Sequence, residues 1–139
     1  RAAAQDYQQR LAALRLRHAD ATPVRVLYQI ETAPVYSINR LSPISEAIML
    51  CGGINVFADL PTLAAPVTDE AVLGTRPQVV IHGPEDAAAV SAYWQRFAKA
   101  STVQPRLIAI DPDLLARAGP RLVQGAEQLC AALDSVRTP

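Results

Sequence analysis

The chain has 139 residues, 50% of them hydrophobic, and its 13 basic residues balance its 13 acidic ones. A chain of this length can bury a core of its own, so we expect a single domain. The balanced charge gives no general attraction for nucleic acid or an anionic membrane, and no apolar run approaches the roughly 20 residues that span a bilayer.

The first part of the chain predicts a helix followed by a buried strand. Residues 1–19 are rich in Ala, Leu, Arg and Gln, which favour helix. The segment 20–23 ends this helix, because the residue before a proline is disfavoured in the helical conformation. Residues 24–30, VRVLYQI, predict a strand covered on both faces of a parallel sheet. The chain begins without a methionine and inside the predicted helix, so we expect part of the functional unit to be missing.

The next part of the chain alternates loops with short elements. A long loop over 31–42 precedes a helix over 43–50, PISEAIML. The sequence Cys-Gly-Gly at 51–53 ends that helix, because glycine readily adopts a positive φ. We expect a brief strand over 55–57 and a loop over 58–67.

A second helix and strand are predicted after position 67. Thr68 is suited to cap a helix over 69–73, since its hydroxyl can accept a hydrogen bond from the first turn. Residues 78–82, QVVIH, predict a strand. An amphipathic helix over 85–100 carries aromatic residues at helical spacing, among them Trp94, which we expect in the core.

The last part of the chain is a strand, a polar loop and a helix. Residues 106–110 predict a buried strand, and the loop over 111–119 contains carboxylates and an arginine. Pro120 suits the first turn of the final helix, because its missing N–H is tolerated there. In open α/β sheets, loops at the carboxyl ends of strands supply the functional side chains. We therefore expect functional residues in the loop over 111–119.

Three apolar strands, each followed by a helical pattern, set the fold class. The right-handed crossover rule makes such strands parallel and places helices on both faces of the sheet. We predict an α/β fold, a three-layer α/β/α sandwich with a mostly parallel central sheet.

Several chemistries lack their sequence signals. The segment after the first strand contains no glycine, which disfavours a dinucleotide cofactor. His18 and His82 lie in different predicted elements, so we expect no metal site. No serine or cysteine occupies a strand-to-helix elbow of the G-x-S-x-G kind. Nothing in the residues indicates an enzyme.

Cys51 and Cys130 are the only cysteines. They can be two buried thiols, since free cysteine is among the most buried residue types. A disulfide is the alternative; it would stabilise the fold by up to about 4.5 kcal/mol on the chain-entropy model and would indicate an oxidising compartment.

Three stretches carry a resemblance to a known family. They are PVYSINRLSPISEAIMLCGGINVFADLP, PVTDEAVLGTRPQVVI and IDPDLLARAGPRLVQGAEQLC. Their most specific parts are the CGG-x-N-x-F box at 51–57, the V-[ST]-x-E box at 67–70, and GPR followed by the QLC cysteine. The chain resembles the carboxyl-terminal lobe of the periplasmic vitamin B12-binding proteins. These are class III substrate-binding proteins, which serve ABC importers for cobalamin, haem and ferric siderophores.

The resemblance implies a division of the chain and a function. Residues 1–20 would be the helix between two lobes, and 21–139 the carboxyl-terminal ligand-binding lobe. The protein would bind cobalamin or a related corrinoid between this lobe and a missing amino-terminal lobe, in the periplasm. It would deliver that ligand to the transmembrane permease of the importer. Cobalamin would be a transported ligand and not a catalytic cofactor.

The resemblance also implies roles for individual residues. Asp113 and Arg117 would be a polar pair facing the ligand, and Tyr36 would line the cleft. Glu70 would dock onto permease arginines, and Cys51 and Cys130 would form a family disulfide. There is one departure, because a cleft tryptophan of some members aligns here with Ala64.

Two alternatives stay open. The ligand can be haem, with Tyr36 as a possible axial ligand, or a ferric siderophore. From another class, the chain can be a free-standing α/β interaction domain. A signal peptide and a matching lobe encoded upstream would favour the transport protein.

Overall fold

The structure, a computed structural model, describes residues 2–117 and 119–137. Its elements in chain order are α1 (Ala2–Arg17), β1 (Val24–Tyr28), β2 (Val35–Ile38), α2 (Pro43–Leu50), β3 (Gly53–Asn55), β4 (Ala64–Val67), α3 (Asp69–Gly74), β5 (Val79–His82), the 3-10 turn η1 (Pro84–Asp86), α4 (Ala87–Arg96), β6 (Arg106–Ala109), the 3-10 turn η2 (Pro112–Leu114) and α5 (Pro120–Arg137). Arg1, Ala118 and residues 138–139, which fall within predicted segments, lie outside the described residues.

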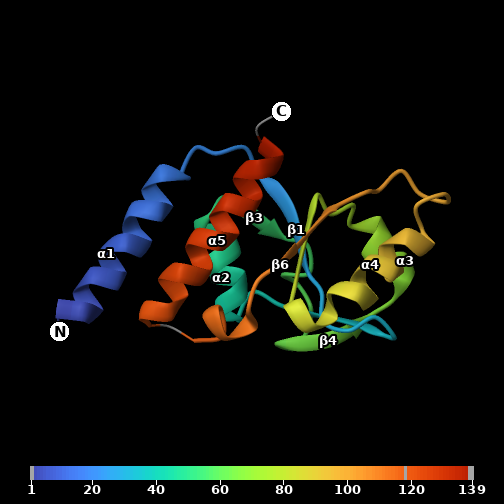
Figure 1. Cartoon of the computed structure of the whole chain (residues 1–139), viewed down its shortest axis with the longest axis horizontal. Helices are drawn as coiled ribbons and strands as arrows, with labels where there is room; N and C mark the ends of the chain where they lie inside the picture. The colour runs from blue at the N-terminus through green and yellow to red at the C-terminus, as the bar shows by residue number, and fades with distance from the viewer. Residues whose placement is uncertain (1, 118, 138–139) are drawn as a thin grey trace.

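The main sheet has the strand order β3-β1-β5-β6, and every neighbouring pair is parallel. The three strands predicted from apolar runs are β1, β5 and β6, so the predicted parallel sheet is confirmed. The predicted burial of β6 was wrong, because β6 is an edge strand with exposed ends and a half-buried middle. Figure 1 shows α1, α2 and α5 on one side of the sheet and α3 and α4 on the other. The predicted three-layer α/β/α architecture is therefore confirmed.

Alternate side chains of the central strands enter two separate cores. Val26 of β1 and Ile81 of β5 pack with α2 and α5, whereas Leu27 and Val80 pack with α3 and α4. A strand buried on both faces has no position for a polar side chain, which explains the nearly continuous apolar sequence. Trp94 is buried in the second core, as predicted, and its Nε1 donates to the Gln29 amide oxygen at 2.9 Å.

Several predicted boundaries were wrong. The loops predicted over 31–42 and 58–67 contain β2 and β4, which pair antiparallel in a small second sheet. The strand predicted over 55–57 begins two residues earlier, at Gly53. The helix predicted over 85–100 is a 3-10 turn followed by α4, which ends at Arg96.

Side-chain caps begin the short helices α2 and α3, and a glycine turn follows α2. The Thr68 hydroxyl accepts a hydrogen bond from the Ala71 N–H at 3.1 Å, which confirms the predicted cap of α3. Ser42 caps α2 in the same way through the Ile44 N–H. After α2 the chain turns at Gly52, whose φ of +80° is one that glycine adopts without steric cost.

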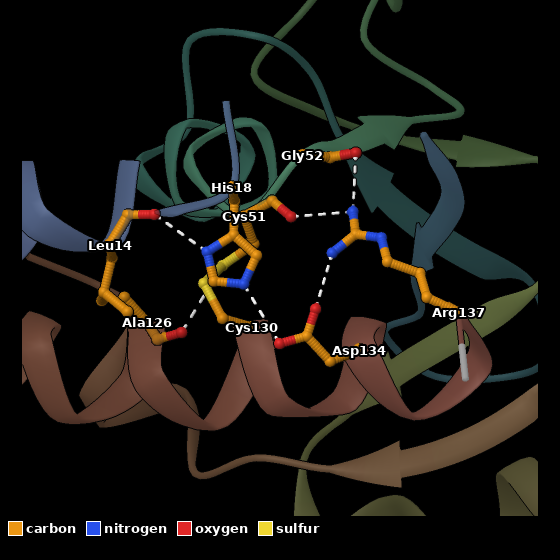
Figure 2. The surroundings of a disulfide bond; sticks show 8 residues. All are labelled: Leu14, His18, Cys51, Gly52, Ala126, Cys130, Asp134 and Arg137. Carbon is orange, nitrogen blue, oxygen red and sulfur yellow. Dashed lines mark hydrogen bonds and ion pairs between the residues drawn. A yellow bond between two sulfur atoms is a disulfide. The ribbon is translucent and has the colours of Figure 1, made fainter. Parts of the chain in front are cut away.

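A disulfide joins α2 to α5. Cys51 and Cys130 are both buried, with their Cα atoms 4.9 Å apart and an S–S bond of 2.09 Å (Figure 2). The predicted disulfide is confirmed, and the alternative of two free thiols is wrong. Because the bond links positions 79 residues apart, it removes considerable freedom from the unfolded chain.

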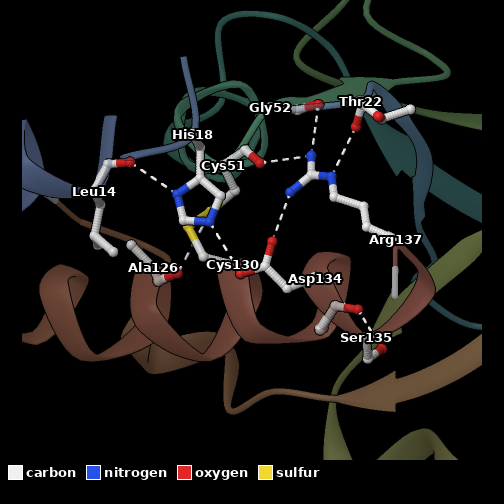
Figure 3. Close-up of polar contacts among 11 residues, drawn as sticks. Leu14, His18, Thr22, Cys51, Gly52, Ala126, Cys130, Asp134, Ser135 and Arg137 are labelled. Atoms are coloured by element: carbon white, nitrogen blue, oxygen red, sulfur yellow. Dashed lines mark hydrogen bonds and ion pairs between the residues drawn. A yellow bond between two sulfur atoms is a disulfide. The ribbon is translucent and has the colours of Figure 1, made fainter. Parts of the chain in front are cut away.

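A polar network surrounds this disulfide and reaches α1 (Figure 3). The buried His18 ring places Nδ1 2.8 Å from the Leu14 carbonyl oxygen and Nε2 3.1 Å from an Asp134 oxygen. Arg137 donates to the other Asp134 oxygen at 2.9 Å and to the Cys51 carbonyl at 2.9 Å. Side chains on α5 thus connect the end of α1 to the end of α2.

The pKa of Asp134 reflects opposing effects. Burial acts to raise the pKa of Asp134, but hydrogen bonds from His18 and Arg137, together with their positive charge, lower it below its ordinary value. A carboxylate whose folded pKa is depressed adds stability above its unfolded pKa and loses it as the pH falls through the folded pKa.

We expect Asp134→Asn to lower the free energy of unfolding at pH 7 by up to about 1 kcal/mol, because the half-exposed side chain is partly screened by solvent. The difference from the unmodified protein should shrink as the pH falls through the lowered pKa of Asp134, because Asp134 itself then becomes protonated. Urea unfolding at pH 7 and at successively lower pH measures it.

Asp59→Asn is the matched control, because Asp59 also pairs with an arginine but its side chain is 90% exposed. It should change stability little at any pH. Equal losses in both variants, or a loss in Asp134→Asn that does not depend on pH, would contradict the assignment.

Candidate functional site

The loops that follow β1, β5 and β6 all leave the sheet at its carboxyl edge. Figure 1 places the segment after β1, the yellow turn after β5 and the orange turn before α5 along the lower edge of the molecule. The starts of α2 and α5 lie at the same edge. Ligands of open α/β sheets bind beyond this edge.

Two adjoining hollows lie at the carboxyl edge. The first, of about 320 Å³, is lined by the predicted pair Asp113 and Arg117 and by Arg121 in the first turn of α5. The second, of about 480 Å³, is lined by Glu85, Asp86, Asp111 and again Asp113. The structure therefore brings Asp113 and Arg117 to one hollow, and Asp113 lies between a basic side and an acidic side.

The first part of the loop, which carries Asp113, is anchored by local hydrogen bonding and by burial. The Asp111 side chain accepts a hydrogen bond from the Asp113 N–H at 2.9 Å. Leu114 and Leu115 are buried and anchor the loop in the core. Gly125 of α5 lets the loop approach closely, because a Cβ there would lie only 2.5 Å from the Leu114 carbonyl oxygen. The backbone from Asp111 to Leu115, which carries the exposed Asp113 side chain, is thus anchored.

The charged side chains of the first hollow can bind polar groups of a ligand. Within residues 2–117 and 119–137, neither Arg117 nor Arg121 forms an ion pair. Both guanidinium groups can donate to carbonyl or phosphate oxygens, and the Asp113 carboxylate can accept from amide N–H groups. Close by, burial and then the charge of Asp86 raise the pKa of Tyr28, so this phenol stays protonated.

Tyr36 does not line either hollow. It lies half-buried in β2, where its backbone exchanges hydrogen bonds with Ile30 at 2.9 and 2.8 Å and its Cα faces Pro66 of β4. Tyr36 thus lies in the small second sheet, which the chain enters after the carboxyl end of β1. Its role in the cleft stays a prediction.

Glu70 lies away from the hollows, in the first turn of α3. Its neighbour Asp69 is already engaged, because it accepts from the Tyr93 hydroxyl at 2.7 Å and lies 3.9 Å from Arg96. Glu70 is exposed and, among the described residues, forms no ion pair. It is available to a partner, as the predicted docking role requires.

Sequence reasoning missed three side chains of the hollows. Glu85 and Asp86 were assigned to a helix, and Arg121 was treated only as part of a motif. Glu85 and Asp86 lie in the turn after β5, and Arg121 lies in the first turn of α5. Their place just after a strand or at the start of a helix could have identified them from the sequence.

Two kinds of feature are absent from the part of the chain that the structure describes. It contains no cluster of three or more His, Cys, Asp or Glu side chains placed to hold a metal ion. No described helix combines the length and the apolar character that crossing a membrane requires.

Known proteins resemble this chain in sequence along nearly its whole length. The vitamin B12-binding protein of Pectobacterium carotovorum is 34% identical over 96% of this chain and 48% of its own length. That of Yersinia pestis is 34% identical over 99% of this chain and 48% of its own length. The chain thus spans about half the length of these relatives. No family model matches it.

Solved structures resemble it in fold. The periplasmic vitamin B12-binding protein of Vibrio cholerae matches with a TM-score of 0.78 and 30% identity, over 97% of this chain and 53% of that one. A periplasmic heme-binding protein of Roseiflexus matches with a TM-score of 0.76 and 24% identity, over 95% and 54%. Sequence and fold together confirm the resemblance to the vitamin B12-binding proteins, and the chain fits the carboxyl-terminal lobe of such a protein.

Proposed function

We propose that this chain is one lobe of a periplasmic substrate-binding protein that captures cobalamin, or a related corrinoid, and delivers it to the permease of an ABC importer. Residues 1–20 are the helix between two lobes, and 21–139 are the ligand-binding lobe. The observation that carries the proposal is the 34% identity to vitamin B12-binding proteins over nearly the whole chain.

The chemistry of the carboxyl edge supports this ligand. A corrinoid carries amide side chains and, in cobalamin, one phosphodiester. Arg117 and Arg121 offer hydrogen-bond donors to the oxygens of such groups, and Asp113 offers an acceptor to amide N–H groups. A hollow of about 320 Å³ is small for such a ligand and lies open, which suits one wall of a larger site.

The attachment of α1 supports its assignment as the helix between lobes. Arg10 forms an ion pair with Glu127 at 3.1 Å, and His18 reaches Asp134 at 3.1 Å. These two contacts hold α1 against α5 near the middle and the end of α1. A helix fixed in this way would set the position of a second lobe relative to the hollows.

The disulfide supports the periplasm as the location. Disulfides persist in oxidising compartments, among them the bacterial periplasm, and are rare in the cytosol. The Cys51–Cys130 bond is buried between α2 and α5. The periplasmic relatives in the comparison agree with this location.

In the complete two-lobed protein, we expect Asp113→Ala and Arg117→Ala each to weaken cyanocobalamin binding by about 1–3 kcal/mol, because each leaves a polar group of the ligand unpaired. Calorimetry measures the change. Lys99→Ala is the matched control, because Lys99 is exposed and lines neither hollow.

Unchanged affinity in both site variants would contradict the assignment of the pair. The same calorimetry with haemin tests the ligand. Tighter binding of haemin than of cyanocobalamin would move the function to haem capture, and Tyr36→Phe would then test the predicted axial ligand.

We expect Glu70→Ala in the complete protein to leave cyanocobalamin affinity unchanged and to reduce uptake through the permease, since an exposed carboxylate can pair with permease arginines. Uptake into proteoliposomes that contain the permease measures the effect. Glu46→Ala is the control, because Glu46 is an exposed carboxylate in the first turn of α2, on the other side of the sheet. Lost ligand affinity with normal uptake at saturating ligand would reverse the role of Glu70.

A further inference from the structure

We propose that Leu41 and Leu63 form an apolar lip of the ligand cleft, which contacts an apolar part of the bound ligand beside the polar hollow. The inference rests on the proposed function, because it concerns the same cleft. It adds two residues that neither the motifs nor the polar hollows identify.

The two leucines are exposed to an unusual degree. Leu41 is 71% exposed and Leu63 is 51% exposed, although most large hydrophobic side chains of the described residues lie in the two cores. Single exposed leucines are common on protein surfaces. Two exposed leucines on adjoining segments of the same edge indicate a binding surface, because an exposed apolar patch often marks one.

A buried asparagine holds the two segments together. The Asn39 N–H donates to the Leu63 carbonyl oxygen at 2.9 Å, and the Asn39 side chain accepts from the Leu41 N–H at 2.9 Å. The same side chain donates to the Leu60 carbonyl oxygen at 3.1 Å. Both leucines therefore project from a backbone that is fixed before any ligand arrives, which lowers the entropy cost of binding.

The lip lies at the same edge as the hollows. Leu41 immediately precedes Ser42, which caps α2, and α2 begins at the carboxyl edge of the sheet (Figure 1). The disulfide fixes α2 against α5, and the first turn of α5 lines the first hollow. Neighbouring packed helices lie roughly 8–10 Å apart, so a large ligand can reach both features.

The place of the lip, at the carboxyl edge that also holds the hollows (Figure 1), favours the ligand as its occupant. Two leucine side chains cover less than the roughly 300–600 Å² of the largest apolar patch on an ordinary protein surface. They are sufficient to cover one apolar edge of a macrocycle, and the neighbouring Ala64 adds little surface of its own.

The test uses the complete two-lobed protein and cyanocobalamin. The double variant Leu41→Gln and Leu63→Gln should raise the Kd by about tenfold, because it removes apolar surface that the ligand covers. Binding should also show a less negative heat-capacity change, which reports buried apolar area. Leu16→Gln is the matched control, because Leu16 is 78% exposed on α1 and precedes no element of the carboxyl edge.

Each other outcome has a distinct meaning. If the unmodified protein binds cyanocobalamin tightly and the double variant binds it equally well, the lip is wrong and the proposed function stands. If the double variant lowers the stability of the ligand-free protein but not its affinity, the leucines contact the other lobe and the inference is overturned. If the unmodified protein binds neither cyanocobalamin nor haemin, both the function and the lip fail.

Discussion

The fixed relation between α2 and α5 is the constraint on which the proposed binding edge depends. The Cys51–Cys130 bond joins the two helices, and Arg137 ties the end of α5 to the carbonyl oxygen of Cys51. Both helices begin at the carboxyl edge, where α5 carries part of the polar hollow and α2 follows the apolar lip. A shift of one helix along the other would change the spacing between these two features. The covalent bond prevents such a shift, and Asp134 with His18 extends the same constraint to α1.

The central sheet was predictable because its signal is local. Residues buried on both faces of a parallel strand must be apolar at nearly every position, and the central strands β1 and β5 satisfy this condition. The small sheet was not predictable in the same way. Its strands are four residues long, β4 contains Pro66, and each strand is defined by a partner far away in the chain. Pairing of that kind leaves little trace in the sequence of either strand alone.

The candidate site also has a part that local sequence predicts and a part that depends on tertiary contacts. Asp113 and Arg117 could be proposed because they follow a strand and lie in a stretch with a family resemblance, and one hollow contains both. Glu85 and Asp86 join the edge only because β5 and β6 are neighbours in the sheet. The exposure of Leu41 and Leu63 depends on the Asn39 contacts between distant loops. Properties that arise from tertiary placement could not be read from the sequence.

The central claim is that this chain supplies one wall of a two-walled cleft. A ligand site normally buries 70–90% or more of its ligand, so one wall alone forfeits much of the contact. A loss of about 4 kcal/mol would turn a nanomolar site into a micromolar one. Calorimetry with cyanocobalamin on residues 1–139 alone, and on the same chain joined to an amino-terminal lobe, tests this most directly. We expect weak or undetectable binding by the chain alone and tight binding by the completed protein, whereas equally tight binding by both would contradict the two-walled cleft.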